Sequence, residues 1–370
     1  MKHSGNYTSN NTANTPKSQE GAPFVSEIVS ARELQLMDLP PVRFIVESIL
    51  PQGLSILAAP AKYGKSWFVL DLCLSVAAGE PLLGFASEKC GTLYLALEDS
   101  LRRLKSRMNA ILKGREAPWD FDYQIRAPTL DNGLIDMLEA YIATHPTLGL
   151  IVVDMLQKVR SQSRQHSTIY AAEYADMTLL KALADKHNIA ILVLHHNRKM
   201  TDASDPFNMI SGTMALMATA DTSLVFTREQ RKDEETSLHV TGRDVEMNTY
   251  VISWDKETYR QRLIGLANDI SIENKEAEYR RDPVVVTILE LLKLNPDGVQ
   301  MSASDFIVAM AQHSCIRNTF TPVGLGKHIL QLKPDLHHYN GVVHKLGRQR
   351  THCFSYDIVA DKENPFLTLL

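Results

Sequence analysis

The chain has 370 residues, enough for two domains or for one large domain with an appendage. Its 44% of apolar and 22% of charged residues are typical of a globular protein with a sizeable core. The net charge of −4 does not indicate nucleic-acid binding, and it does not exclude it, because local basic surfaces matter more than the total.

No export signal or membrane span is visible in the sequence. The amino terminus is polar, and no uninterrupted apolar run reaches the ~18 residues that a spanning helix needs. The four cysteines are scattered and form no Cys-x-x-Cys pair, which favours buried thiols in a reducing compartment over a disulfide or metal framework. We therefore expect a cytoplasmic protein that does not enter a membrane.

The first segment, residues 1–23, is rich in Ser, Asn, Thr and Gly and carries almost nothing apolar. Such a segment cannot bury enough surface to offset its ordering entropy, so we predict a disordered polar tail. Residues 31–37 then predict a short helix, and residues 44–50 predict a strand.

From residue 53 to about 255, strand-like apolar runs alternate with stretches of helical spacing. β-branched runs such as residues 150–153 suit the interior of a parallel sheet, and their alternation with helices predicts a doubly wound α/β core. The last strands lack intervening helices, so we expect them to form an antiparallel extension. The predicted strands are 54–58, 92–97, 149–153, 189–194, 222–227, 237–241 and 250–254, and the predicted helices are 66–78, 100–113, 133–144 and 170–187.

The carboxyl-terminal quarter reads as a separate unit. We predict one domain over residues 24–260, a charged linker over 261–281 and a small α+β domain over 282–370, because Asp282-Pro283 marks a break. Helices are predicted at 284–294, 302–312 and 322–332, and a hairpin at 342–345 and 351–356. Three helices followed by a hairpin is the order of a winged helix, so this domain is predicted to be winged-helix-like.

The loop after the first core strand contains the first candidate functional residues. A strand, a tight loop ending in Gly64, Lys65 and Ser66, and then a helix is the context of a phosphate-binding P-loop. Backbone N–H groups would surround a phosphate, Lys65 would add a full charge, and Ser66 would ligate Mg²⁺. The usual first glycine is replaced by Ala59. The predicted nucleotide-binding residues are Ala59, Pro60, Ala61, Lys62, Tyr63, Gly64, Lys65, Ser66 and Trp67.

Acidic residues follow two of the predicted strands. In an open α/β sheet, ligands bind beyond the carboxyl ends of the strands, so these residues face the predicted phosphate. Asp154 fits the acidic partner of Mg²⁺, and Glu98 fits the group that orients or deprotonates the attacking water. Asp99 fits better as a helix cap than as a catalytic group.

His195 and His196 end another strand. Adjacent strand residues point in opposite directions, so at most one of these histidines should face the nucleotide. Beside the other strand-end groups, a sensor of the γ-phosphate is the favoured role, with an ordinary structural histidine as the alternative. A metal site at the pair is not expected, because no cluster of Cys, His or carboxylates supports it.

Together these motifs resemble the RepA-like hexameric helicases of the RecA-like ATPase superfamily. The resemblance rests on the P-loop, residues 93–99, 150–154 and 193–196, and it covers roughly residues 40–255. It implies a RecA-like fold, ATP hydrolysis at subunit interfaces, and a homo-oligomeric ring that moves on single-stranded DNA. In that family Glu98 matches the catalytic glutamate, Asp154 the Walker B aspartate, and the histidine pair the sensor motif.

The resemblance also implies roles for residues after the histidine pair. Residues 211–213 with Asp221 resemble the next family motif, near the site, and Arg243 matches the arginine finger that acts on a neighbouring subunit. An ion pair of Arg243 with Asp244 or Glu246 remains the alternative. The family match is weakened at Met155, where some relatives carry a second acidic residue.

Two basic segments are candidates for nucleic-acid contact. Arg198 and Lys199 lie on a connection that would face the channel of a ring, although an ordinary solvated loop is as well supported. Residues 327–350 contain five basic residues and a single acidic one, Asp335, and such an excess of positive charge suits contact with a duplex backbone. The basic residues are Lys327, Lys333, Lys345, Arg348 and Arg350. Such a domain can also dock a protein.

The leading hypothesis is an Mg²⁺-dependent ATPase that translocates on single-stranded DNA as a replicative helicase of a plasmid, phage or mobile element. An ATP-gated DNA-binding regulator or loader without unwinding activity is the alternative. A small-molecule kinase fits poorly, because no lid or second substrate pocket is indicated.

Overall fold

The computed structural model describes residues 29–161, 168–197, 205–210, 214–228, 234–313 and 320–357, so the predicted tail over residues 1–23 lies outside these residues. The described residues divide into two units between residues 42 and 43. In the first unit, the predicted short helix is present as α1 (Ala31–Leu36), where Ser30 and Glu33 form a reciprocal capping box.

The centre of the second unit is one large sheet within the described residues. Its strands, in chain order, are β3 (Gly53–Ala59), β4 (Gly91–Ala96), β5 (Phe121–Gln124), β6 (Leu148–Asp154), β7 (Ala190–His196), β8 (Thr222–Thr227), β9 (Glu235–Gly242), β10 (Asn248–Asp255) and β11 (Arg260–Leu266). They lie side by side in the order β11-β10-β9-β8-β3-β7-β6-β4-β5. A small antiparallel pair, β1 (Phe44–Val46) and β2 (Leu50–Pro51), precedes β3.

The sheet has a parallel part and an antiparallel part. Strands β8, β3, β7, β6, β4 and β5 pair in parallel. Strands β9, β10 and β11 extend this sheet antiparallel to their neighbours. The α/β class, the mostly parallel sheet and the antiparallel extension predicted from the sequence are therefore confirmed.

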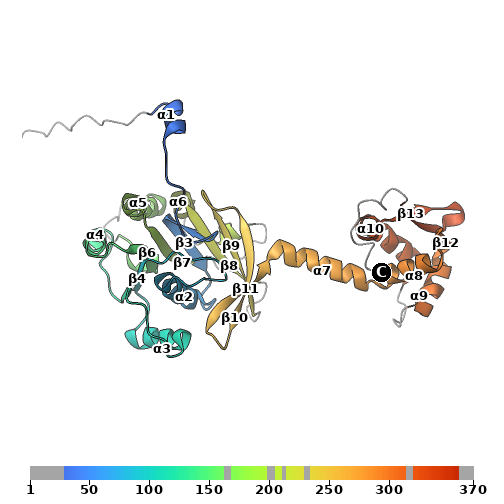
Figure 1. Ribbon diagram of the computed structural model, residues 1–370, viewed down its shortest axis with the longest axis horizontal. Helices are drawn as coiled ribbons and strands as arrows, with labels where there is room; N and C mark the ends of the chain where they lie inside the picture. The colour runs from blue at the N-terminus through green and yellow to red at the C-terminus, as the bar shows by residue number, and fades with distance from the viewer. Residues whose placement is uncertain are drawn as a thin grey trace, which may run out of the picture. The chain divides into compact units, whose positions relative to one another are not determined.

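Helices cover both faces of the sheet (Figure 1). On one face a hydrophobic core joins the sheet to α2 (Lys65–Ala78) and α3 (Leu101–Leu112). On the other face a second core joins it to α4 (Leu134–Thr144), α5 (Ile169–His187) and α6 (Met214–Thr219). Strand β3 is buried along its whole length, as an interior strand covered on both faces must be.

The charged segment predicted as a linker over residues 261–281 is regular structure instead. Strand β11 pairs with β10, and α7 (Ala267–Arg281) follows directly. The charged residues of this strand alternate with less exposed ones, and Gln261 is buried, so a strand with one solvent-facing side looks like a linker in sequence.

The carboxyl-terminal part has a hydrophobic core of its own. It contains α8 (Pro283–Leu294), β12 (Val299–Met301), α9 (Ala303–His313), α10 (Pro322–Asn340), β13 (Val342–Leu346) and β14 (His352–Tyr356). Three helices followed by a hairpin match the predicted order, and β12 adds a third strand beside β14. Helix α10 continues past Pro334, whereas the sequence predicts an end at residue 332. None of the described helices is both long and apolar enough to span a membrane.

Candidate active site

The predicted P-loop joins the carboxyl end of β3 to the start of α2. Gly64 precedes the helix with a left-handed φ of 86°, and no side chain caps the helix there. The uncapped amino terminus therefore offers N–H groups and the positive end of a helix dipole to an anion. Ala59 is the last residue of the extended β3, with an ordinary strand backbone, so this position needs no glycine.

Lys65 is buried against this loop, with 8% of its surface exposed. Its Nζ donates to the carbonyl oxygens of Ala59 at 2.5 Å and of Pro60 at 3.2 Å. Burial lowers the pKa of Lys65, while the charges of Asp154 and Glu98 oppose this shift. The ammonium group is thus held at the loop and near two carboxylates.

Asp154 ends β6 beside the P-loop. Its Oδ2 accepts a hydrogen bond from the Ser66 hydroxyl at 3.2 Å and from the Tyr94 hydroxyl at 2.7 Å. Burial raises the pKa of Asp154, and these two hydrogen bonds act against the shift. The structure therefore brings together Ser66 and Asp154, the two residues predicted to hold Mg²⁺.

Glu98 lies in the turn after β4, with 44% of its side chain exposed. Its carboxylate is 3.8 Å from Nζ of Lys158, in the 3-10 turn (Leu156–Lys158) after β6. Its charge acts on Lys65, Asp154 and His196, so it belongs to the same cluster. Because the Glu98 carboxylate is exposed, it can contact a water molecule beside the P-loop cluster.

The two histidines that end β7 point to opposite faces of the sheet, as predicted. Leu192 and Leu194 belong to the core under α2, so alternation places His196 on that face and His195 on the other. His196 is exposed, whereas His195 is 7% exposed. Burial and then the charge of Lys65 lower the pKa of His196, which locates its ring among the charges of the site. His196 is thus the sensor candidate, and His195 is a buried strand residue.

Asp99 is held by residues at the start and middle of helix α3. Its carboxylate contacts Arg103 at 3.0 Å and Arg107 at 2.7 Å, and it accepts from the Ser100 backbone at 2.8 Å. The N-cap of α3 is Ser100, whose hydroxyl accepts from the Arg103 backbone. The prediction that Asp99 caps this helix is therefore wrong, because the capping residue is its neighbour Ser100.

A cavity of about 300 Å³ opens beside the P-loop. The Arg228 guanidinium lies 4.9 Å from the ring centre of Tyr63, and Trp67 stacks on Tyr259 at 5.6 Å. None of the lining residues from the antiparallel extension was predicted from the sequence. The aromatic residues of its late strands are the one signal that could have found them. The described lining residues are Lys62, Tyr63, Gly64, Trp67, Arg228, Thr236, Ile252, Ser253, Trp254 and Gln261.

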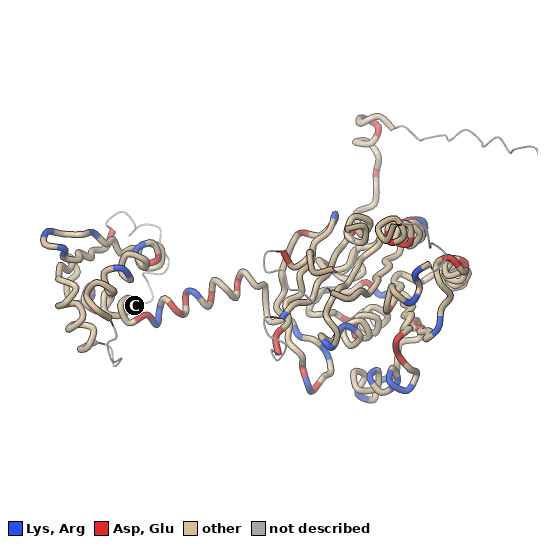
Figure 2. The backbone as a smooth tube through the Cα atoms, turned by 180° about the vertical axis from the view of Figure 1, so that it is seen from behind, with Lys and Arg blue, Asp and Glu red and all other residues tan. Residues whose placement is uncertain are grey.

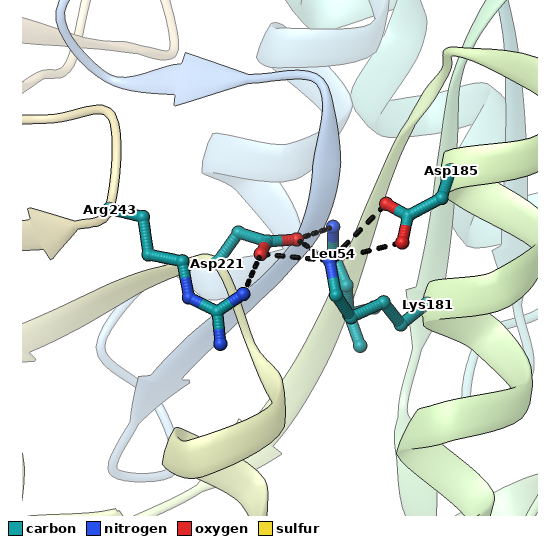
Figure 3. A network of polar contacts seen from close by, with 5 residues as sticks. All are labelled: Leu54, Lys181, Asp185, Asp221 and Arg243. Carbon is teal, nitrogen blue, oxygen red and sulfur yellow. Dashed lines mark hydrogen bonds and ion pairs between the residues drawn. The ribbon is translucent and has the colours of Figure 1, made fainter. Parts of the chain in front are cut away.

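Arg243 and Asp221 lie near the amino end of β3, whereas the P-loop follows its carboxyl end. Figure 3 shows the polar contacts around Asp221. Asp221 precedes β8, which runs parallel to β3, and its carboxylate accepts from the backbone N–H of Leu54 at 3.0 Å. It also binds Nζ of Lys181 at 2.8 Å and the Arg243 guanidinium at 3.1 Å. The expectation that Asp221 lies near the site of its own chain is wrong.

The alternative role of Arg243 also needs correction. Its ion-pair partner is Asp221, not the predicted Asp244 or Glu246. The Arg243 side chain is 60% exposed. The structure therefore does not bring Arg243 to the P-loop of its own chain. Arg198, Lys199 and residues 211–213, which were also singled out, lie outside the described residues.

Known proteins are similar to part of the chain. Residues 22–202 match the model of the family described as AAA domain. No curated protein matches the chain. The structure is similar to the ATPase domain of G40P, with a TM-score of 0.47 and 13% identity over 57% of this chain and 84% of that chain. It is also similar to a DnaB-like replicative helicase solved with its interactions with primase, with a TM-score of 0.46 and 13% identity over 57% of each chain.

Proposed function

We propose that the AAA domain matched over residues 22–202 hydrolyses ATP with Mg²⁺, and that the chain works as a ring-shaped helicase on single-stranded DNA. The observation that carries the ATPase proposal is the cluster at the carboxyl edge of the parallel strands. There Lys65, Ser66 and Asp154 meet within hydrogen-bonding distance of the loop or of each other. The charges of Lys65, Glu98 and Asp154 all influence the pKa of His196, so Glu98 and His196 belong to the same cluster.

The side chains present fit Mg²⁺. Ser66 and Asp154 offer a hydroxyl and a carboxylate oxygen, the hard donors that this ion prefers. No group of three or more Cys, His or acidic side chains in the described part of the chain could hold a metal. Bound Mg²⁺ usually takes its remaining ligands from phosphate and water, and it supplies charge neutralisation on the phosphates.

The protein groups divide the remaining work. Lys65 would exchange its contacts with the Ala59 and Pro60 carbonyls for the β/γ-phosphates. Glu98 would orient the attacking water and accept its proton, since it is the exposed carboxylate of the cluster. His196 would contact the γ-phosphate. The cavity lined by Tyr63 and Arg228 would take the base, because a planar base stacks on an aromatic ring or on a guanidinium.

Glu98→Gln tests the division of roles. The variant should bind ATP as the wild type does, because the amide keeps the size of the side chain, but it should not hydrolyse ATP. Binding is measured by titration with labelled ATP, and hydrolysis by phosphate release. Normal hydrolysis would place the water-activating group elsewhere.

The helicase part of the proposal is supported by the motif resemblance. A ring would bring Arg243 of one subunit to the nucleotide of the next, where its exposed guanidinium stabilises transition-state charge. Native mass in the presence and absence of ATP and single-stranded DNA tests for the ring. Displacement of a labelled strand from forked DNA tests for unwinding. A monomer under all conditions would remove the basis for both.

A second candidate function is supported by the carboxyl-terminal hairpin. Lys345 on β13 and the turn residues Arg348 and Arg350 lie at one end of the hairpin. Basic positions along the backbone are blue in Figure 2. A basic hairpin beside three helices suits contact with a duplex backbone. An ATP-gated DNA-binding regulator or loader would bind duplex DNA in an ATP-dependent way and would not displace a strand.

A further inference from the structure

Tyr94 is a buried polar residue beside the candidate metal ligands. It lies in β4, where it is opposite Val152 of β6, and Ala96, two residues on, is opposite Asp154. Residues two apart in a strand face the same side, so the tyrosine ring lies under α2 on the side of the P-loop. Its side chain is completely buried.

The tyrosine hydroxyl makes one specific contact. It donates to Oδ2 of Asp154 at 2.7 Å, the shorter of the two hydrogen bonds which that oxygen accepts. The other comes from Ser66 at 3.2 Å. A hydroxyl buried without a partner would cost free energy, so the Asp154 carboxylate and the Tyr94 hydroxyl each satisfy the other.

The two donors to Oδ2 differ in what they would do on nucleotide binding. The Ser66 hydroxyl is the proposed metal ligand and would turn to the ion. Tyr94 is fixed in the core and cannot follow. It would therefore remain the group that holds the carboxylate in one orientation.

We propose that Tyr94 is a positioning residue that orients Asp154 and thereby sets the affinity of the site for Mg²⁺. The proposal rests on the proposed Mg²⁺-dependent ATPase function. Partners that hydrogen-bond to metal-binding carboxylates orient these ligands, and their loss typically weakens metal binding by ~10- to 100-fold. The effect should appear in metal affinity, whereas nucleotide binding without metal should be unchanged.

Tyr94→Phe tests this, because it removes only the hydroxyl and keeps the ring in the core. Mg²⁺ is titrated into protein with a fixed concentration of ADP, and the rise in melting temperature is followed. The half-saturating Mg²⁺ concentration should increase by ~10-fold or more. The melting-temperature rise with ADP in EDTA should equal that of the wild type. An unchanged Mg²⁺ dependence would overturn the proposal.

Tyr141→Phe is the matched control. It removes a comparable hydrogen bond, from Tyr141 to Asp122 at 2.6 Å, at a place outside the P-loop cluster. It should leave the Mg²⁺ titration unchanged. If the wild type itself shows no Mg²⁺-dependent stabilisation by ADP, the proposed function fails and not the role of Tyr94 alone.

A second pair of variants tests whether Tyr94 acts through Asp154. In Asp154→Asn the carboxylate is already lost, so adding Tyr94→Phe should cause no further loss of Mg²⁺ affinity. Equal affinities of the single and double variants support an action through Asp154. A further ~10-fold loss in the double variant would show that Tyr94 acts by another route.

Discussion

Arg243 offers a prediction in which two roles give opposite results. In the structure it is one of three groups on the Asp221 carboxylate, together with Lys181 and the backbone N–H of Leu54 (Figure 3). In a ring it would instead act on the nucleotide of the neighbouring subunit. Arg243→Ala removes both possible interactions.

The structure indicates how much each role is worth. The Arg243 side chain is 60% exposed, and an exposed ion pair contributes ~0–1 kcal/mol to stability. Asp221 would keep its contacts with Lys181 and Leu54. Arg243→Ala should therefore lower the free energy of unfolding by at most ~1 kcal/mol. Loss of an arginine finger should lower ATP turnover by about 10³- to 10⁵-fold.

Chemical unfolding and phosphate release measure the two effects on the same preparations. Lys181→Met is the matched control: it breaks the more buried ion pair with Asp221, so it should cost more stability than Arg243→Ala, with turnover retained. Mixing Arg243→Ala with Lys65→Ala subunits should restore part of the turnover, because some mixed interfaces contain both intact residues. A large loss of stability with normal turnover in Arg243→Ala would refute the finger.

Three further predictions concern other parts of the chain. Burial lowers the pKa of His344 to about 4, so acid favours the unfolded chain, in which this histidine protonates more readily. Urea unfolding should show that the carboxyl-terminal core loses at most ~3 kcal/mol of stability as the pH falls from 6.5 towards 4. Constant stability over this range would contradict the prediction. Replacing Arg348 and Arg350 with Ala should weaken duplex binding and lower its salt dependence, measured by fluorescence anisotropy, and should leave ATP turnover in the absence of DNA unchanged; an unaltered salt slope would exclude the hairpin as a phosphate contact. Tyr63→Ala should raise the KM for ATP more than it lowers kcat in steady-state assays, because stacking serves binding, and an unchanged KM would place the base elsewhere.

Much of the α/β core is predictable because its strands are buried on both faces. Such strands, like β3 and β6, are continuous apolar runs that stand out in the sequence. Strand β5 was missed because it is a short edge strand of mixed character, Phe-Asp-Tyr-Gln, with only Phe121 buried. Strand β11 and helix α7 were missed because their exposed charged residues hide a weak pattern of buried ones.

The residues of the candidate site were predictable where they follow the carboxyl end of a parallel strand. Lys65, Ser66 and Asp154 meet because β3 and β6, which lead to them, are parallel strands of one sheet on either side of β7, so their carboxyl ends lie at the same edge. The same rule explains the error at Asp221, which precedes a parallel strand and therefore lies at the amino edge. Tyr94 gave no signal, because its role depends on a contact with a residue 60 positions away.

The central claim is that the P-loop cluster hydrolyses ATP, and Lys65→Ala tests it most directly. ATP turnover is measured with Mg²⁺ for the wild type and the variant, and circular dichroism establishes that both are folded. Turnover by the wild type and a loss of ~10²-fold or more in the variant are predicted, since Lys65 is the buried cation of the loop. Equal turnover in the two folded proteins would contradict the assignment.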